Sequence, residues 1–362
     1  MMNDEALVES SSLILVGRVN QIASRLLPSD AIVTDVELTA TAILKGDTAG
    51  STVTVRVPGG QVGDRVEWIF GAPQFFLGEE VVLFLVQNAQ GEWQTTSLAM
   101  GKFGVRRRED GSTVVVRELG PGTALYAPGG GFASPAPQEE PLEDFLARIA
   151  QLAGSRPQQP IPTPAPTSAT EDVGGTVEYR AAFTLLGNPP ARWHEADSGT
   201  PVTYVSTADS ALGPTVSMQA VTDALAAWST VPGVGLVLSY GGLISPTPTP
   251  EPGFPTPTPL GYGGCGFNRV IFDDPRGEIS NPTNCSGTLA IGGYCASAFP
   301  QVTVNGTTFS AITAGKVVMN DGWSSQCPYF WTPCLVAEVL THEIGHSIGF
   351  GHSSENASEP NA

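Results

Sequence analysis

Hydrophobic and polar residues alternate along most of the first 120 residues. In STVTVRVPGG, Val53, Val55 and Val57 fall on one face and polar residues on the other. This period of two, in β-branched residues, is typical of half-buried strands. Further strands are expected in AIVTDVELTATAIL, EEVVLFLVQ and STVVVREL, separated by Gly-rich breaks such as PGGQVGD. The pattern predicts an all-β accessory domain, a barrel or sandwich, over residues 1–126. This region contains no His and no Cys, and we find no catalytic set in it.

The pattern then changes to a Pro-rich linker over residues 127–172. Within it, PLEDFLARIAQLAG carries apolar residues at three- and four-residue spacing, with acids in the first turn and a glycine after the end. This spacing predicts an amphipathic helix over residues 141–153 that docks on a neighbour.

Residues 173–362 mix the two periods and predict an α+β domain. Strands are expected in TPVTYVS, GLVLSY, RVIFDD and AGKVVMND. Helices are expected in TVSMQAVTDALAAWSTV and from about Cys334 to Gly349. A Pro/Thr-rich insertion over residues 245–259 interrupts the pattern.

Composition narrows the function classes. The chain of 362 residues has a formal charge of −18, which argues against a nucleic-acid surface. Its basic cluster, Arg106 to Arg108, precedes two acids and is interpreted as a solvated hairpin end. No apolar run reaches the roughly 18 residues of a membrane helix. The acidic start does not resemble a signal peptide, and Leu13 to Val16 is interpreted as a strand.

All five cysteines lie in the last hundred residues, without a C-x-x-C pair. Such clustering favours disulfides and an oxidising compartment, although buried free thiols are the alternative. Sequence proximity suggests Cys327 with Cys334 and Cys285 with Cys295, leaving Cys265 over. We therefore expect a secreted, extracellular protein whose export signal precedes the visible start.

The segment HEIGHSIGFGH carries the candidate chemistry. On a helix, His342 and His346 lie one turn apart on one face, and Glu343 lies between them in sequence. Gly349 allows the chain to reverse, so that His352 returns to the same point. Three neutral imidazoles leave an open tetrahedral position, which is typical of catalytic zinc. The remaining histidine, His194, stands alone and is interpreted as a surface or packing residue.

This arrangement predicts zinc-dependent hydrolysis of peptide bonds. Zinc lowers the pKa of its bound water to about 7, and Glu343 is expected to take the proton as general base. A zinc hydrolase acting on a non-peptide amide is a less favoured alternative.

At these residues the chain resembles the metzincin metalloproteases, whose signature H-E-x-x-H-x-x-G-x-x-H it matches at every fixed position. Ser353 after the third histidine is similar to the matrixin type. The resemblance extends over about residues 175–362. It implies a zincin domain with a twisted, mostly parallel sheet, two long helices and an edge strand lining the substrate cleft. It also implies that His342, His346 and His352 bind zinc and that Glu343 is the base.

Three features depart from or extend the resemblance. The Pro-Arg-Cys-Gly switch of matrixin propeptides is missing, so the first domain is not assumed to be a latency prodomain. Calcium accompanies the family, and Asp273, Asp274 and Glu278 are candidate ligands, although a plain turn explains them as well. No methionine follows His352. We therefore expect a chain truncated before the methionine turn, which binds zinc weakly and cleaves poorly.

The expected partner is a protein or peptide substrate, and the oligomeric state is not indicated. The alternative function, from a different class, is a non-catalytic extracellular binding or adhesion protein on a degenerate metalloprotease scaffold.

Overall fold

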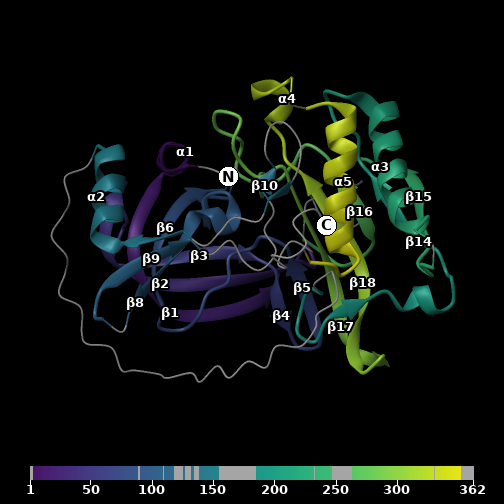
Figure 1. Ribbon diagram of the computed structural model, residues 1–362, viewed down its shortest axis with the longest axis horizontal. Helices are drawn as coiled ribbons and strands as arrows, with labels where there is room; N and C mark the ends of the chain where they lie inside the picture. Colours follow the sequence, from purple (N-terminus) through teal and green to yellow (C-terminus); the bar gives the residue numbers. More distant parts are fainter. Residues whose placement is uncertain are drawn as a thin grey trace.

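The computed structural model is a mixed α+β protein with two eight-stranded sheets (Figure 1). It describes residues 3–88, 90–108, 110–117, 125–126, 132–133, 138–154, 185–231, 233–246, 263–329 and 331–351. Most of the predicted linker, most of the Pro/Thr-rich insertion, and His352 lie outside the described residues.

The first sheet contains most of the strands expected in residues 1–126. Its spatial order is β1 (Leu13–Leu26), β2 (Ile32–Lys45), β3 (Thr52–Pro58), β7 (Trp93–Thr95), β6 (Glu80–Gln87), β8 (Lys102–Arg107), β9 (Thr113–Arg117) and β12 (Gln138–Pro141). β1 also pairs with β6, which closes β1, β2, β3, β7 and β6 into a ring. The ring encloses a core of alternating Val and Leu side chains. Arg106 to Arg108 are exposed, as expected for a hairpin end.

Two helices cover one side of this sheet. The predicted amphipathic helix is present as α2 (Leu142–Leu152), which buries Phe145 and Ile149 against Phe84 and Phe103. The helix α1 (Asp4–Ser10) was not predicted. Asn3 caps it by accepting from the Ala6 N–H at 2.9 Å, and two acids in its first turn favour the helix dipole. The first region is therefore not purely β.

The second sheet holds the candidate site. Its order is β15 (Leu238–Leu243), β14 (Val202–Ser206), β16 (Asn268–Ile271), β18 (Thr307–Met319), β17 (Ala290–Val304), β5 (Arg65–Ile69) and β4 (Gly60–Val62), with β13 (Ala191–Arg192) beside β18. The first four strands are parallel, and β17 is antiparallel to β18. The helices α3 (Gly213–Ser229) and α5 (Pro333–Ser347) lie side by side against this sheet and share its core (Figure 1).

Shorter elements complete the structure. They are β10 (Leu125–Tyr126), β11 (Phe132–Ala133), α4 (Trp323–Gln326) and the 3-10 turns η1 (Leu98–Gly101) and η2 (His194–Asp197). α5 and α3 agree with the two helices that the sequence predicts in residues 173–362.

The strands β4 and β5 belong to the first region in sequence but to the second sheet in space. The glycines of PGGQVGD predict a break between strands; instead, Gly60–Val62 forms β4, which pairs with β5. β5 in turn pairs antiparallel with β17 over Arg65–Ile69. The unpaired backbone groups of an edge strand can pair with a strand from a distant part of the chain. Sequence periodicity does not reveal which two strands will pair.

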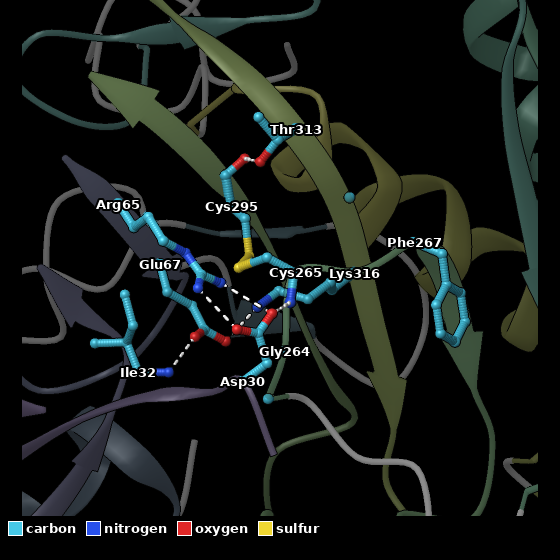
Figure 2. Close-up of a disulfide and its surroundings, with 12 residues drawn as sticks. Asp30, Ile32, Arg65, Glu67, Gly264, Cys265, Phe267, Cys295, Thr313 and Lys316 are labelled. Atoms are coloured by element: carbon cyan, nitrogen blue, oxygen red, sulfur yellow. Dashed lines mark hydrogen bonds and ion pairs between the residues drawn. A yellow bond between two sulfur atoms is a disulfide. The ribbon is translucent and has the colours of Figure 1, made fainter. Parts of the chain in front are cut away.

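A buried ion pair anchors β5 in the second sheet. The Lys316 ammonium of β18 binds the Glu67 carboxylate of β5, and neither side chain is more than 1% exposed. Glu67 also accepts from the Ile32 N–H of β2 (Figure 2). Burial lowers the pKa of Lys316, and the charge of Glu67 opposes this shift. One carboxylate thus joins both sheets.

Glu67→Ala should reduce the free energy of unfolding by about 3–5 kcal/mol, because it leaves the Lys316 charge buried without its partner. The double variant Glu67→Gln/Lys316→Met should recover most of this loss, since glutamine still accepts from Ile32. Denaturant unfolding measures both. Arg65→Ala, which breaks the exposed pair with Asp30, is the control and should cost less than about 1 kcal/mol. A loss from Glu67→Ala as small as the control's would contradict the anchoring role.

Candidate functional site

The helix α5 begins where its sequence provides a cap. The Thr332 side chain accepts from the Leu335 N–H at 3.3 Å, and Pro333 occupies the first turn, where its missing N–H costs nothing. Leu335, Val336, Val339, Leu340 and Ile344 are buried against the sheet and α3. This apolar face fixes the rotation of the helix and therefore the direction of its histidines.

His342 and His346 face each other, as the spacing predicts. Their Nε2 atoms lie 3.1 Å apart, with the rings edge to face. Nδ1 of His346 lies 2.8 Å from the Phe350 carbonyl oxygen. A carbonyl oxygen only accepts, so Nδ1 of His346 donates, and Nε2 is the nitrogen directed toward His342. Burial lowers the pKa of His342 to about 4, which keeps that ring neutral at pH 7.

Glu343 follows His342 on α5 and is buried, but in the described part of the chain its carboxylate oxygens do not lie within 4.8 Å of both imidazoles. Burial raises the pKa of its carboxyl group to about 8, against the opposing effect of a hydrogen bond from the Gly292 N–H. Its second oxygen, Oε2, has no hydrogen-bond partner among the described residues. A buried carboxylate oxygen without a partner is costly unless something polar meets it, and is therefore a mark of a functional site.

The chain reverses after α5 at the predicted glycine. Gly349 has a φ of +103°, and a Cβ there would lie 2.4 Å from the Ala191 carbonyl oxygen, so only glycine fits. Phe350 stacks on Trp228 of α3, whose Nε1 donates to the Thr341 carbonyl at 2.7 Å. Trp228 therefore contacts the residue before His342 and the residue after Gly349. His352 follows one residue after the described segment.

Two residues that the sequence analysis did not identify lie at the site. The ring of Phe70, which follows β5, stacks on the His346 ring with centroids 3.9 Å apart and planes 12° apart. Gly292 of β17 meets Glu343 so closely that a Cβ would lie 2.4 Å from the Glu343 carbonyl oxygen and 2.8 Å from Oε2. No local signal points to either residue, because both approach α5 from distant parts of the chain.

The disulfide pairing differs from the prediction. Cys265 pairs with Cys295 and Cys285 with Cys327, whereas Cys334 is an exposed free thiol. The predicted pairs were nearest in sequence, but β17 carries Cys295 away from Cys285, and α5 holds Cys334 on its exposed surface. Two disulfides suit an oxidising compartment.

One group of three potential metal ligands converges within 4.8 Å among the described residues, namely Glu67, Cys265 and Cys295. The two sulfurs are joined to each other (Figure 2), and Glu67 binds Lys316 and Ile32. A cysteine binds a metal ion as its thiolate, and neither cysteine of a disulfide is a thiolate. This group is therefore better described as a disulfide beside an ion pair.

The candidate calcium ligands follow β16. Asp273 accepts from the Ser210 N–H at 2.8 Å and Asp274 from the Ile279 N–H at 2.7 Å. Desolvation, reinforced by the charge of Glu278, raises the pKa of Asp274 to about 7. Their oxygens, with those of Glu278, do not converge within 4.8 Å in the described part of the chain. Calcium binding stays a prediction.

His194 lies apart in η2, half-buried, as a packing residue would. Among the described residues, no helix combines the length and apolar character needed to cross a bilayer. No protein-family model matches the chain, and no curated protein matches it.

Gly292→Ala should reduce the free energy of unfolding by about 1–3 kcal/mol, because the added methyl group collides with the Glu343 backbone. Gly104→Ala is the matched control, since its Cβ would meet nothing nearer than the Val116 carbonyl oxygen at 4.0 Å. Denaturant unfolding compares the two. Equal losses would show that β17 and α5 are not held at this close approach.

Asp274→Asn should stabilise the protein increasingly as pH rises. The folded carboxyl group has a pKa of about 7 against its ordinary value of 3.8, so the folded state retains its proton to higher pH and wild-type stability falls between about pH 4 and 7. Asparagine removes this loss, so above pH 7 the free energy of unfolding of the variant should exceed that of the wild type by up to about 4 kcal/mol. Thermal unfolding in EDTA measures the difference, which should vanish near pH 4. The exposed Asp47→Asn is the control, and a pH-independent difference for Asp274→Asn would refute the assignment.

Proposed function

We propose that the chain is a secreted zinc-dependent endopeptidase of the matrixin-like metzincin type. His342, His346 and His352 hold the metal, and Glu343 is the general base. The observation that carries the proposal is the approach of two imidazole Nε2 atoms to 3.1 Å, on the helix that also carries the buried Glu343.

The described residues fit a zinc ion. Two nitrogens at about 2.0–2.1 Å from a tetrahedral zinc lie about 3.3 Å from each other, close to the observed separation. The pKa of His342 is lowered, and the Nδ1–H of His346 is directed to a carbonyl oxygen, which leaves Nε2 of His346 toward His342. The third ligand in the proposal, His352, lies outside the described residues, one position after Gly351.

Bound zinc supplies Lewis acidity, which polarises a substrate carbonyl and makes water easier to deprotonate. The charge of a bound ion would favour the ionised form of Glu343, which would then accept a proton from water at Oε2, the oxygen without a protein partner, and pass it to the leaving amine. Gly292 leaves room for this carboxylate, since a Cβ there would lie 2.8 Å from Oε2. Phe350 fixes the His346 ring through its carbonyl oxygen.

The architecture around the site supports the proposal. The support is a mixed sheet with four parallel strands, packed against the two helices α3 and α5. The two disulfides support export. The alternative is a non-catalytic extracellular binding protein on the same scaffold; it requires no base, and a buried Glu343 would then bring only a desolvation cost.

Glu343→Gln should bind one zinc per chain, as the wild type does, and should lower kcat/KM for peptide cleavage by about 10²- to 10⁴-fold, because glutamine cannot accept the proton. His346→Ala should lose the zinc itself. Metal analysis and cleavage of a quenched fluorescent peptide measure these effects, and EDTA followed by zinc should abolish and restore cleavage.

His194→Ala is the matched control, because it removes the histidine outside the site; zinc content and cleavage should both be unchanged. A zinc-loaded Glu343→Gln variant with wild-type cleavage would exclude Glu343 as the base. Zinc binding without any cleavage by the wild type would favour the binding protein.

A further inference from the structure

A segment of the first region lies along β17, directly beside the candidate site. Arg65–Ile69 pair antiparallel with Gly293–Ser297, and the Phe70 N–H continues this ladder by donating to the Gly292 carbonyl oxygen at 2.9 Å. The other side of β17 pairs with β18. Residues 293–297 therefore have strands on both sides.

The same segment ends on the functional residues. The Phe70 ring stacks on His346, and its backbone is bonded to Gly292, the residue that approaches Glu343 so closely that a Cβ would collide with it. An extended peptide thus runs along the sheet and places an aromatic side chain on a proposed metal ligand.

Extended peptides bind proteins by adding a strand to a sheet, with main-chain hydrogen bonds providing affinity. β5 uses those hydrogen bonds on β17. We propose that the outer side of β17 is the docking surface for an extended peptide substrate, and that residues 65–70 of the same chain occupy it and hold the endopeptidase back. This inference rests on the proposed function and adds its regulation.

The occupant is held by more than its ladder. The Glu67–Lys316 pair is buried beneath it, and Asp30 binds Arg65 and accepts from the Cys265 N–H (Figure 2). Ile69 packs with apolar side chains of the second sheet, namely Ile271, Ile291 and Val318. A tethered occupant has a high effective concentration, in the millimolar range for short linkers, so a free peptide competes poorly until the segment is displaced.

Phe70→Ala in the full chain tests this proposal. Removing the ring uncovers His346 and weakens the end of the ladder, so kcat/KM for a quenched fluorescent peptide should rise roughly 3- to 10-fold. Phe70→Tyr keeps the stacked ring and should match the wild type. Phe76→Ala, which removes an exposed phenylalanine (61% exposed), is the matched control and should also match it.

A second measurement uses the unaltered chain and does not depend on a variant that folds. Zinc-loaded wild type is mixed with a peptide hydroxamate, and backbone amide exchange is followed over residues 65–70. Binding should accelerate exchange there, because the probe displaces the segment, and should leave β6 protected. Bound hydroxamate with unchanged exchange over residues 65–70 would overturn the proposal.

The outcomes separate the two proposals. If zinc binds and the wild type cleaves, but Phe70→Ala cleaves no faster, the occupancy proposal fails and the endopeptidase stands. If neither chain binds zinc at His342 and His346, or neither cleaves with zinc bound, the endopeptidase itself fails.

Discussion

The antiparallel ladder between β5 and β17 is the contact on which the arrangement of the two sheets depends. It carries a strand from the first seventy residues into a sheet built from the last hundred and seventy. The ladder satisfies backbone groups that would otherwise be unpaired, and the Glu67–Lys316 pair beneath it penalises separation. Two regions that composition divides are thereby joined through one strand, one carboxylate and a shared apolar cluster.

The chemistry of the site follows from how rigidly α5 is held. Trp228 packs on Gly345 and bonds to Thr341, while the Tyr204 hydroxyl bonds to the Ser347 hydroxyl at 2.8 Å. These contacts hold α5, which carries both imidazoles and the carboxylate, against α3 and the sheet. Burial supplies the second condition, because a low-dielectric environment keeps His342 neutral and makes an unsatisfied oxygen on Glu343 costly.

The first region contributes residues to the surroundings of the candidate site. Its sequence has no catalytic residues and no cysteine switch, which left its role open. In the structure it contributes Phe70, whose ring stacks on His346, and β5, which pairs with β17. The disulfide Cys265–Cys295 links β17 to the segment that precedes β16.

The sequence by itself determined the local features. The i, i+4 spacing places two histidines on one face of the helix expected from about Cys334, Gly349 ends it, and alternating valines predict β3. These depend on contacts within a few residues, where stereochemistry dictates the outcome. Only the tertiary structure decided which cysteines pair, that Gly60–Val62 is a strand, and that Phe70 and Gly292 meet the histidine helix. Each of these joins residues far apart in the chain, and which distant segments become neighbours is set by the burial and pairing of whole sheets, which local periodicity does not encode.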